Sequence, residues 1–122
     1  MKPKIVAFDM DEVLCSRTLE DGGVEKYYSC YPLKDMIDIV NECHEKGFHI
    51  IIYTARGMSI FKGNVARVYD NLYALTKNQL KEWGVKHHDL IMGKPHYDIL
   101  IDDKVINSLR VQDLEDITKR LE

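Results

Sequence analysis

The sequence lacks the features that mark membrane-spanning, secreted and nucleic-acid-binding proteins. No apolar run approaches the roughly 20 residues that a transmembrane helix needs. The 17 lysines and arginines are outnumbered by 20 aspartates and glutamates, the net charge is −3, and no dense basic stripe occurs. The three cysteines form no C-x-x-C pair, which is typical of reduced thiols in the cytoplasm. We therefore expect a cytoplasmic protein that binds neither nucleic acid nor membranes.

Internal repeats, linkers and low-complexity tracts are also missing, and the chain begins with a strand-like run instead of a signal-peptide pattern. The apolar fraction of 45% and the charged fraction of 30% are ordinary values for a globular domain. A length of 122 residues fits one such domain. We predict a single domain over residues 1–122.

What the sequence does contain is a series of short apolar runs alternating with amphipathic stretches. The apolar runs predict buried strands, at residues 5–8, 48–53, 90–92 and 99–101. Apolar residues at helical spacing predict helices, at residues 32–47, 64–84 and 114–121. This order indicates an α/β fold in which right-handed crossovers build a Rossmann-like parallel sheet. We expect three layers, with helices on both faces of the sheet.

Residues 15–31 break this alternation. They hold two polar stretches with aromatic residues on either side of Asp21-Gly22-Gly23, which is a hairpin signal. The sequence predicts a flap of two short strands just after Asp11. Its three tyrosines can pack the flap against the domain or contact a ligand, and we favour packing.

Polar side chains directly follow three of the apolar runs, at Asp9, Thr54 and Asp102. Ligands of an open parallel sheet bind outside the carboxyl ends of its strands. The three residues should therefore project from one edge of the sheet, although they are far apart in the chain.

Carboxylates and a lysine at that edge suit phosphoryl transfer. Asp9, Asp11 and Asp102 would repel one another without a cation, and Mg²⁺ is a hard cation that prefers oxygen ligands. An aspartate can attack phosphorus to form an aspartyl-phosphate, and Asp9 is the candidate. Asp11 is placed to act as general acid and base, and Lys94, in the sequence GKP, can stabilise the carboxylate and the phosphate.

Four pieces occur in one order, KIVAFDMDEVL, HIIIYTAR, GKP and ILIDD, and this set resembles the haloacid dehalogenase (HAD) superfamily of phosphatases. The resemblance implies that Asp9 is the nucleophile and that Asp11 is the general acid and base, which also gives a backbone carbonyl to the metal. It implies that Thr54 binds the phosphoryl group and that Lys94 neutralises charge. Glu12 stands where many members carry glycine.

The same resemblance implies that Asp102 supplies a metal carboxylate and that Asp103 assists through water. The stretch between Asp11 and Thr54 leaves no room for a cap domain. YTARG, EWGV and GKPHYDILIDDK are similar to small capless phosphatases of capsule and surface-polysaccharide biosynthesis. This similarity implies a small phosphorylated metabolite as substrate, either a sugar or a polyol-type phosphomonoester.

Several alternatives stay open. Arg56 can bind the part of the substrate that is not transferred, or form a structural salt bridge. The same nucleophile would serve a phosphotransferase or mutase. A receiver-like phosphoacceptor module uses similar residues, but in a different order. The oligomeric state is undetermined, and so is whether the flap or a neighbouring subunit closes the site.

Overall fold

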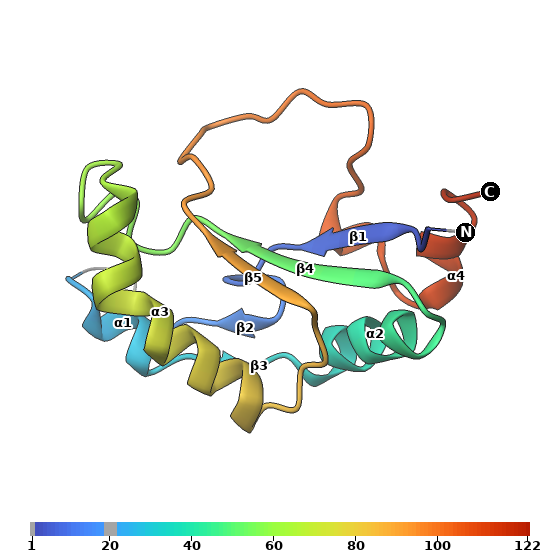
Figure 1. Ribbon diagram of the computed structural model, residues 1–122, viewed down its shortest axis with the longest axis horizontal. Helices are drawn as coiled ribbons and strands as arrows, with labels where there is room; N and C mark the ends of the chain where they lie inside the picture. Colours follow the sequence, from blue (N-terminus) through green and yellow to red (C-terminus); the bar gives the residue numbers. More distant parts are fainter. Residues whose placement is uncertain (1, 19–21) are drawn as a thin grey trace.

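The computed structural model describes residues 2–18 and 22–122 and shows a mixed α/β fold (Figure 1). Three parallel strands form the main sheet in the order β1-β4-β5. Their bounds are Ile5–Phe8 (β1), His49–Thr54 (β4) and Asp89–Met92 (β5). Short, mostly aliphatic runs of this kind suit strands inside a parallel sheet, because neighbouring strands and crossover helices surround them. The strands predicted around residues 5–8, 48–53 and 90–92 are confirmed.

Helices make the crossovers between these strands. The two long ones lie before and after β4, and two short helices and a 3₁₀ turn complete the set: α2 (Lys34–Glu45), α3 (Val65–Glu82), α1 (Glu25–Tyr28), α4 (Leu114–Thr118) and η1 (Ser108–Arg110). Asn64 caps α3 as predicted, since its side chain accepts a hydrogen bond from the Arg67 N–H. Gly84 follows α3 with a φ of +68°, which ends the helix.

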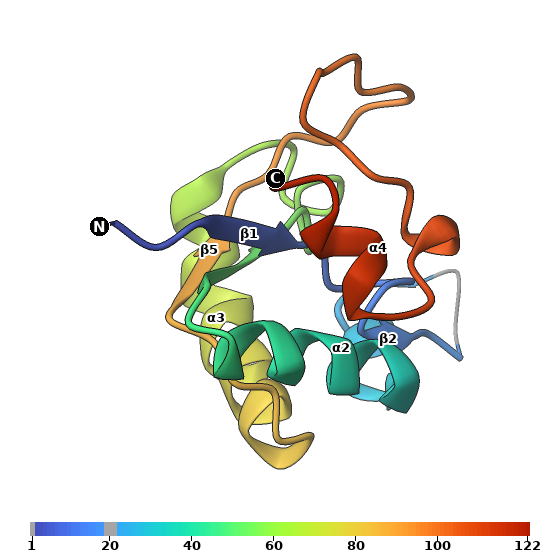
Figure 2. The same cartoon turned by 90° about the vertical axis from the view of Figure 1, so that its right-hand side faces the viewer.

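The sheet is covered by helices on one face. Along β4 the side chains alternate, so that Ile50 and Ile52 are buried on the face that meets α2 and α3. Ile5 and Ile91 lie on the opposite face and are exposed. Figures 1 and 2 show α2 and α3 on one side of the strands and the segment after β5 arching over the other. The prediction of helices on both faces is therefore wrong for this structure, which has two layers.

The fourth predicted strand, at residues 99–101, is not formed. This segment belongs to an irregular stretch between β5 and η1. Ile99 is 78% exposed and Ile101 is 94% exposed. A three-residue apolar run gains strand structure only by pairing, and among the described residues β1 pairs with β4 alone.

The predicted flap is present only at its base. Its two strands, β2 (Cys15–Ser16) and β3 (Tyr31–Pro32), pair antiparallel. Between them the chain forms helix α1 where a strand was expected, and Asp21 lies outside the described residues. Burial explains the helix: the Tyr27 side chain is 5% exposed, and its hydroxyl accepts a hydrogen bond from the Gly57 N–H.

Candidate functional site

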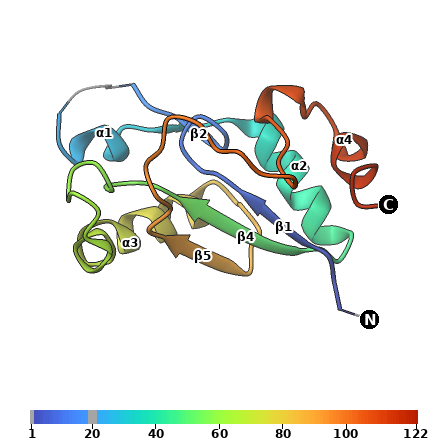
Figure 3. The same cartoon turned by 90° about the horizontal axis from the view of Figure 1, so that it is seen from above.

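Three of the predicted site residues meet at the carboxyl edge of the sheet. Asp9 follows β1, Thr54 ends β4 and Lys94 follows β5. The Lys94 Nζ lies 3.5 Å from the Asp9 Oδ2, and the Lys94 N–H donates to the Thr54 carbonyl over 3.1 Å. Seen from above, the arrowheads of the three strands point the same way (Figure 3). The parallel register therefore brings Asp9 and Thr54 to one edge as predicted, with Lys94 beside them, whereas Asp102, the third residue predicted there, does not follow a strand.

Glycine is needed before Lys94. Gly93 turns the chain after β5 with a φ of +92°, a region that residues with a Cβ rarely adopt. A Cβ added there would lie 3.1 Å from a methyl group of Val65. This turn directs the Lys94 backbone toward Thr54. The ammonium also lies 5.4 Å from the ring centre of Tyr97 and 5.8 Å from that of Tyr53, over their faces.

The two oxygens of the Asp9 carboxylate have different partners, and the side chain stays accessible to solvent. Its Oδ1 accepts a hydrogen bond from the Met10 N–H at 2.7 Å, and its Oδ2 faces Lys94. The side chain remains 39% exposed, whereas that of Lys94 is 15% exposed. A fixed carboxylate that is open to solvent and next to a shielded cation is suited to attack an incoming electrophile.

Thr54 lies beneath this edge. It is 1% exposed, and its Oγ1 accepts a hydrogen bond from the Arg56 N–H at 3.1 Å. The hydroxyl is therefore held by the turn that follows β4. A ligand must come close to that turn to reach it.

Asp11 faces inward, toward Arg56. The guanidinium Nε lies 3.0 Å from Asp11 Oδ2 and its Nη2 lies 3.1 Å from Oδ1. Its Nη1 donates to the Thr76 hydroxyl and the Gln79 side-chain carbonyl on α3. Burial works to lower the pKa of Arg56, but Asp11 outweighs it and leaves that pKa raised. Arg56 is thus committed to internal partners, which favours the structural salt bridge over substrate binding.

Two cysteines complete this buried cluster. The Asp11 carboxylate and the sulfurs of Cys15 and Cys30 lie within 4.8 Å of one another. However, the Arg56 Nη2 is 3.5 Å from the Cys15 sulfur and 3.6 Å from that of Cys30. Burial, the largest effect, raises the pKa of both thiols. A guanidinium already supplies the positive charge here, and thiols are poor ligands for Mg²⁺.

Sequence reasoning missed this cluster. The single hint was that Cys15 lies four residues after Asp11, because nothing in the sequence shows Cys30 or α3 approaching the same carboxylate.

Asp102 and Asp103 lie in the irregular exposed segment. The Asp102 carboxylate accepts a hydrogen bond from the Lys104 N–H at 3.2 Å, which lowers its pKa. Asp9, Asp11 and Asp102 do not come within 4.8 Å of one another as a group; within residues 2–18 and 22–122, only Asp11 and the two cysteines do so. The three aspartates have the oxygen chemistry that Mg²⁺ prefers, but this structure does not assemble them.

Comparison with known proteins gives one strong structural likeness. No family model matches the chain, and neither does any curated protein. The crystal structure of an MCSG target from Vibrio cholerae is similar, with 28% sequence identity and a TM-score of 0.82. The likeness covers 96% of this chain and 95% of that one. It indicates a shared fold over nearly the whole length and carries no statement of activity.

The described helices of this fold are too short or too polar to cross a membrane. Within the described part of the chain, none combines the length and the apolar character that a bilayer crossing requires.

Proposed function

We propose that this protein is a phosphomonoester hydrolase of the HAD type, with Asp9 as its nucleophile. The observation that supports the proposal best is the meeting of Asp9, Lys94 and Thr54 at one edge of a parallel sheet, with 3.5 Å between Lys94 Nζ and Asp9 Oδ2. The ordered motifs of the sequence support it independently.

In the proposed reaction, an Asp9 oxygen attacks phosphorus and forms an O–P bond while the bond to the leaving oxygen breaks. Water then attacks the aspartyl-phosphate, which releases phosphate and restores the carboxylate. Lys94 stabilises the negative charge of the transferring group. Acid–base help is typically worth ~10²–10⁴-fold, whereas this hydrolysis can need up to ~10²¹-fold acceleration. Positioning and charge stabilisation must therefore supply most of the rate.

Asp11 is proposed as the general acid and base: once it has left Arg56 and taken up a proton from solvent, it protonates the leaving oxygen, and its carboxylate then takes a proton from the attacking water. In the structure its carboxylate is held by Arg56, with contacts of 3.0 and 3.1 Å. The proposal therefore requires Asp11 to turn from Arg56 toward the sheet edge when substrate binds. Arg56 acts on the reaction through Asp11, not through the substrate.

Mg²⁺ is proposed as the cofactor because the candidate ligands, Asp9, Asp11 and Asp102, all offer oxygen atoms. Asp103 would assist through a water molecule. When bound, the ion would supply positive charge between the carboxylates and the phosphate. Because Asp102 is not beside Asp9 here, the proposal includes a rearrangement of residues 98–107, which leaves Lys94 beside Asp9. Within residues 2–18 and 22–122, β1 pairs only with β4, and the apolar residues 99–101 are exposed. Strand addition at the other edge of β1 would therefore be favourable, since it pairs backbone groups and buries apolar surface.

The proposed substrate is a small phosphorylated sugar or polyol-type metabolite of surface-polysaccharide biosynthesis. An accessible Asp9, 39% exposed, suits a substrate that reaches an uncapped edge. The sequence similarity to capless phosphatases supports this class.

Free-phosphate release tests the proposal. The panel contains sugar, polyol and nucleotide monophosphates, each with Mg²⁺ and with EDTA. Asp9→Asn is compared with Asp70→Asn, which makes the same change at an exposed position of α3. We expect Mg²⁺-dependent release that is lost in Asp9→Asn and kept in Asp70→Asn. Substantial release by Asp9→Asn would contradict the assigned nucleophile.

The molecule that accepts the phosphoryl group distinguishes hydrolysis from the alternative functions. A phosphotransferase or mutase would pass the group to a second metabolite, and a receiver-like module would hold it on an aspartate without turnover. Release to water at many turnovers per chain supports the hydrolase.

A further inference from the structure

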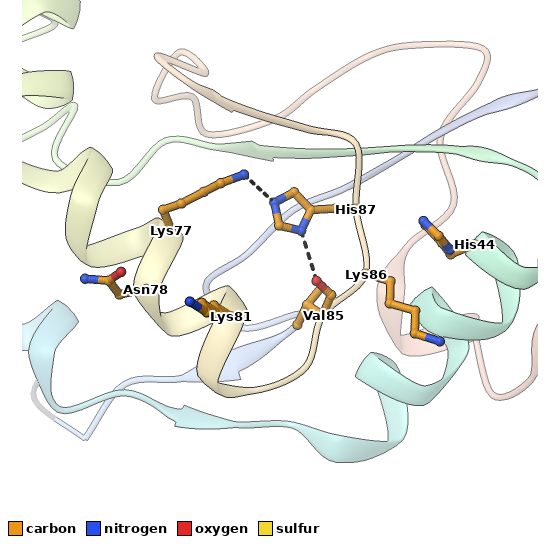
Figure 4. Close-up of a pocket in the computed structure, with 7 residues that line it drawn as sticks. All are labelled: His44, Lys77, Asn78, Lys81, Val85, Lys86 and His87. Carbon is orange, nitrogen blue, oxygen red and sulfur yellow. Dashed lines mark hydrogen bonds between the residues drawn. The ribbon is translucent and has the colours of Figure 1, made fainter.

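A pocket lies at the end of the sheet opposite the Asp9 edge. It has a volume of about 430 Å³ and sits between the last turns of α2 and α3 and the turn that leads into β5 (Figure 4). It is lined by His44, Lys77, Asn78, Lys81, Val85, Lys86 and His87. This lining has three lysines, two histidines and no acidic residue. Pockets of this volume hold small metabolites.

Two basic groups of the lining, one on α3 and one before β5, contact each other. The Lys77 Nζ lies 3.0 Å from the His87 Nε2, and the His87 Nδ1 lies 3.0 Å from the Val85 carbonyl (Figure 4). An ammonium can only donate, so Nε2 accepts and Nδ1 carries the proton. His87 is therefore neutral in this arrangement. Burial is the main cause of its lowered pKa, and Lys77 lowers the pKa further.

The neighbouring groups leave the pocket positive. The Lys86 Nζ pairs with the Glu45 carboxylate at 3.5 Å. At the start of the neighbouring strands, the His49 Nε2 lies 2.6 Å from the Asp89 carboxylate. His88 stacks against the rings of His44 and His49, at 4.8 and 4.6 Å between centres.

The His88 Nδ1 accepts a hydrogen bond from the Ile50 N–H at 3.0 Å, so His88 is neutral too. Lys77 and Lys81 have no carboxylate partner among the described ion pairs.

Helix-end electrostatics explain only part of this set. Basic residues in the last turn are favoured by the helix dipole, which accounts for Lys81 on α3 and His44 on α2. Lys77 lies more than a turn before the end of α3, and Lys86 lies beyond it. Lys77 points toward His87, whereas the Lys86 side chain extends away from them, and its ammonium pairs with Glu45 (Figure 4).

We propose that this pocket binds a small dianion of the phosphate type, as carried by a phosphorylated metabolite. The anion replaces His87 as the partner of Lys77, and the freed His87 Nε2 takes up a proton and donates to the same anion. Lys81 lies one turn along α3 on the same side, because i and i+4 residues are neighbours on a helix. Binding is thus coupled to uptake of one proton. The site is separate from the Asp9 edge and does not depend on the proposed hydrolase activity.

NMR of the His87 imidazole tests the site directly, with inorganic phosphate as the probe. The resonance reports locally, so phosphate binding near Lys94 does not confuse it. The test variant is Lys77→Gln with Lys81→Gln. The matched control is Lys34→Gln with Lys119→Gln, which removes the same charge from exposed ion pairs elsewhere. Circular dichroism verifies that both variants are folded.

We expect saturable phosphate titration of His87 in the native chain and the control, and at least ~10-fold weaker binding in the test variant, as for the loss of two charge-assisted contacts. Equal binding in both variants would overturn the site, and so would a His87 resonance that phosphate does not move.

Sulfate then tests the proton coupling, because it stays a dianion between pH 8 and pH 6. The groups that face His87 are Lys77 on α3, His88 and Asp89 at β5, and the Val85 carbonyl; Lys81, Lys86 and His44 complete the pocket. We expect sulfate to bind severalfold more tightly at pH 6 than at pH 8 in the native chain, and the gain to disappear in His87→Gln. Affinity that does not depend on pH would overturn the coupling.

Discussion

The Arg56 guanidinium, in a residue that is 1% exposed, donates hydrogen bonds to both oxygens of the Asp11 carboxylate. The sequence places Asp11 in the candidate site. Gln79 extends this contact, because its side-chain amide donates to the Tyr27 carbonyl on α1 at 2.6 Å while its oxygen accepts from Arg56. The ion pair therefore links Asp11, three residues beyond the end of β1, to α3 and to α1.

Removing Arg56 should destabilise the protein strongly. Arg56→Met leaves the Asp11 carboxylate without its buried partner, and breaking such a pair typically costs about 3–5 kcal/mol. Urea unfolding of Arg56→Met is compared with Arg67→Met, which removes an exposed arginine on α3. Adding Asp11→Asn to Arg56→Met should recover part of the loss, since no unpaired charge remains. Equal stabilities of the two single variants would contradict the ion-pair interpretation.

Lys94 should matter for turnover and little for stability. Lys94→Gln removes the charge that lies 3.5 Å from Asp9. Loss of one group that stabilises developing charge typically lowers kcat by about 10²–10³-fold. Phosphate-release assays compare it with Lys104→Gln, an exposed lysine in the irregular segment. A kcat for Lys94→Gln near the native value would remove Lys94 from the proposed mechanism.

The segment of residues 99–103 should become ordered when Mg²⁺ binds. In the present arrangement these residues form no described strand and should exchange their amide hydrogens quickly. Pairing with β1 would slow this exchange, and hydrogen-exchange mass spectrometry with and without Mg²⁺ measures it. Asp102→Asn should abolish the slowing, whereas Asp98→Asn should not. Unchanged exchange at saturating Mg²⁺ would contradict the rearrangement.

His87 should make stability depend on pH. Its pKa is lowered in the folded state, mainly by burial, so the unfolded chain binds this proton more readily. The contribution of neutral His87 is present above its unfolded pKa of about 6.5 and is lost as pH falls through the folded value. The free energy of unfolding of the native chain should therefore fall, relative to that of His87→Gln, when pH drops from 7.5 to 5. A difference that stays constant over this range would contradict the assigned neutral state.

Local patterns predicted the elements whose burial is regular. The alternation in β4, the apolar runs of β1 and β5, and the Asn64 cap can each be read from neighbours in the sequence, because strand and helix periodicities are local properties. Parallel pairing then brings Asp9, Thr54 and Lys94 to one edge. That part of the candidate site needed only strand ends and their direction.

Tertiary structure decided what those patterns leave open. The sequence predicts a strand at residues 99–101, yet a run of three needs a partner, and no segment that the structure describes pairs with it. Arg56 could face a ligand or the interior, and Thr76 and Gln79 on α3 hold it inside. The cysteines and the basic pocket are likewise assembled from separate elements. Such contacts depend on how helices pack across the sheet, which the local spacing of residues does not specify.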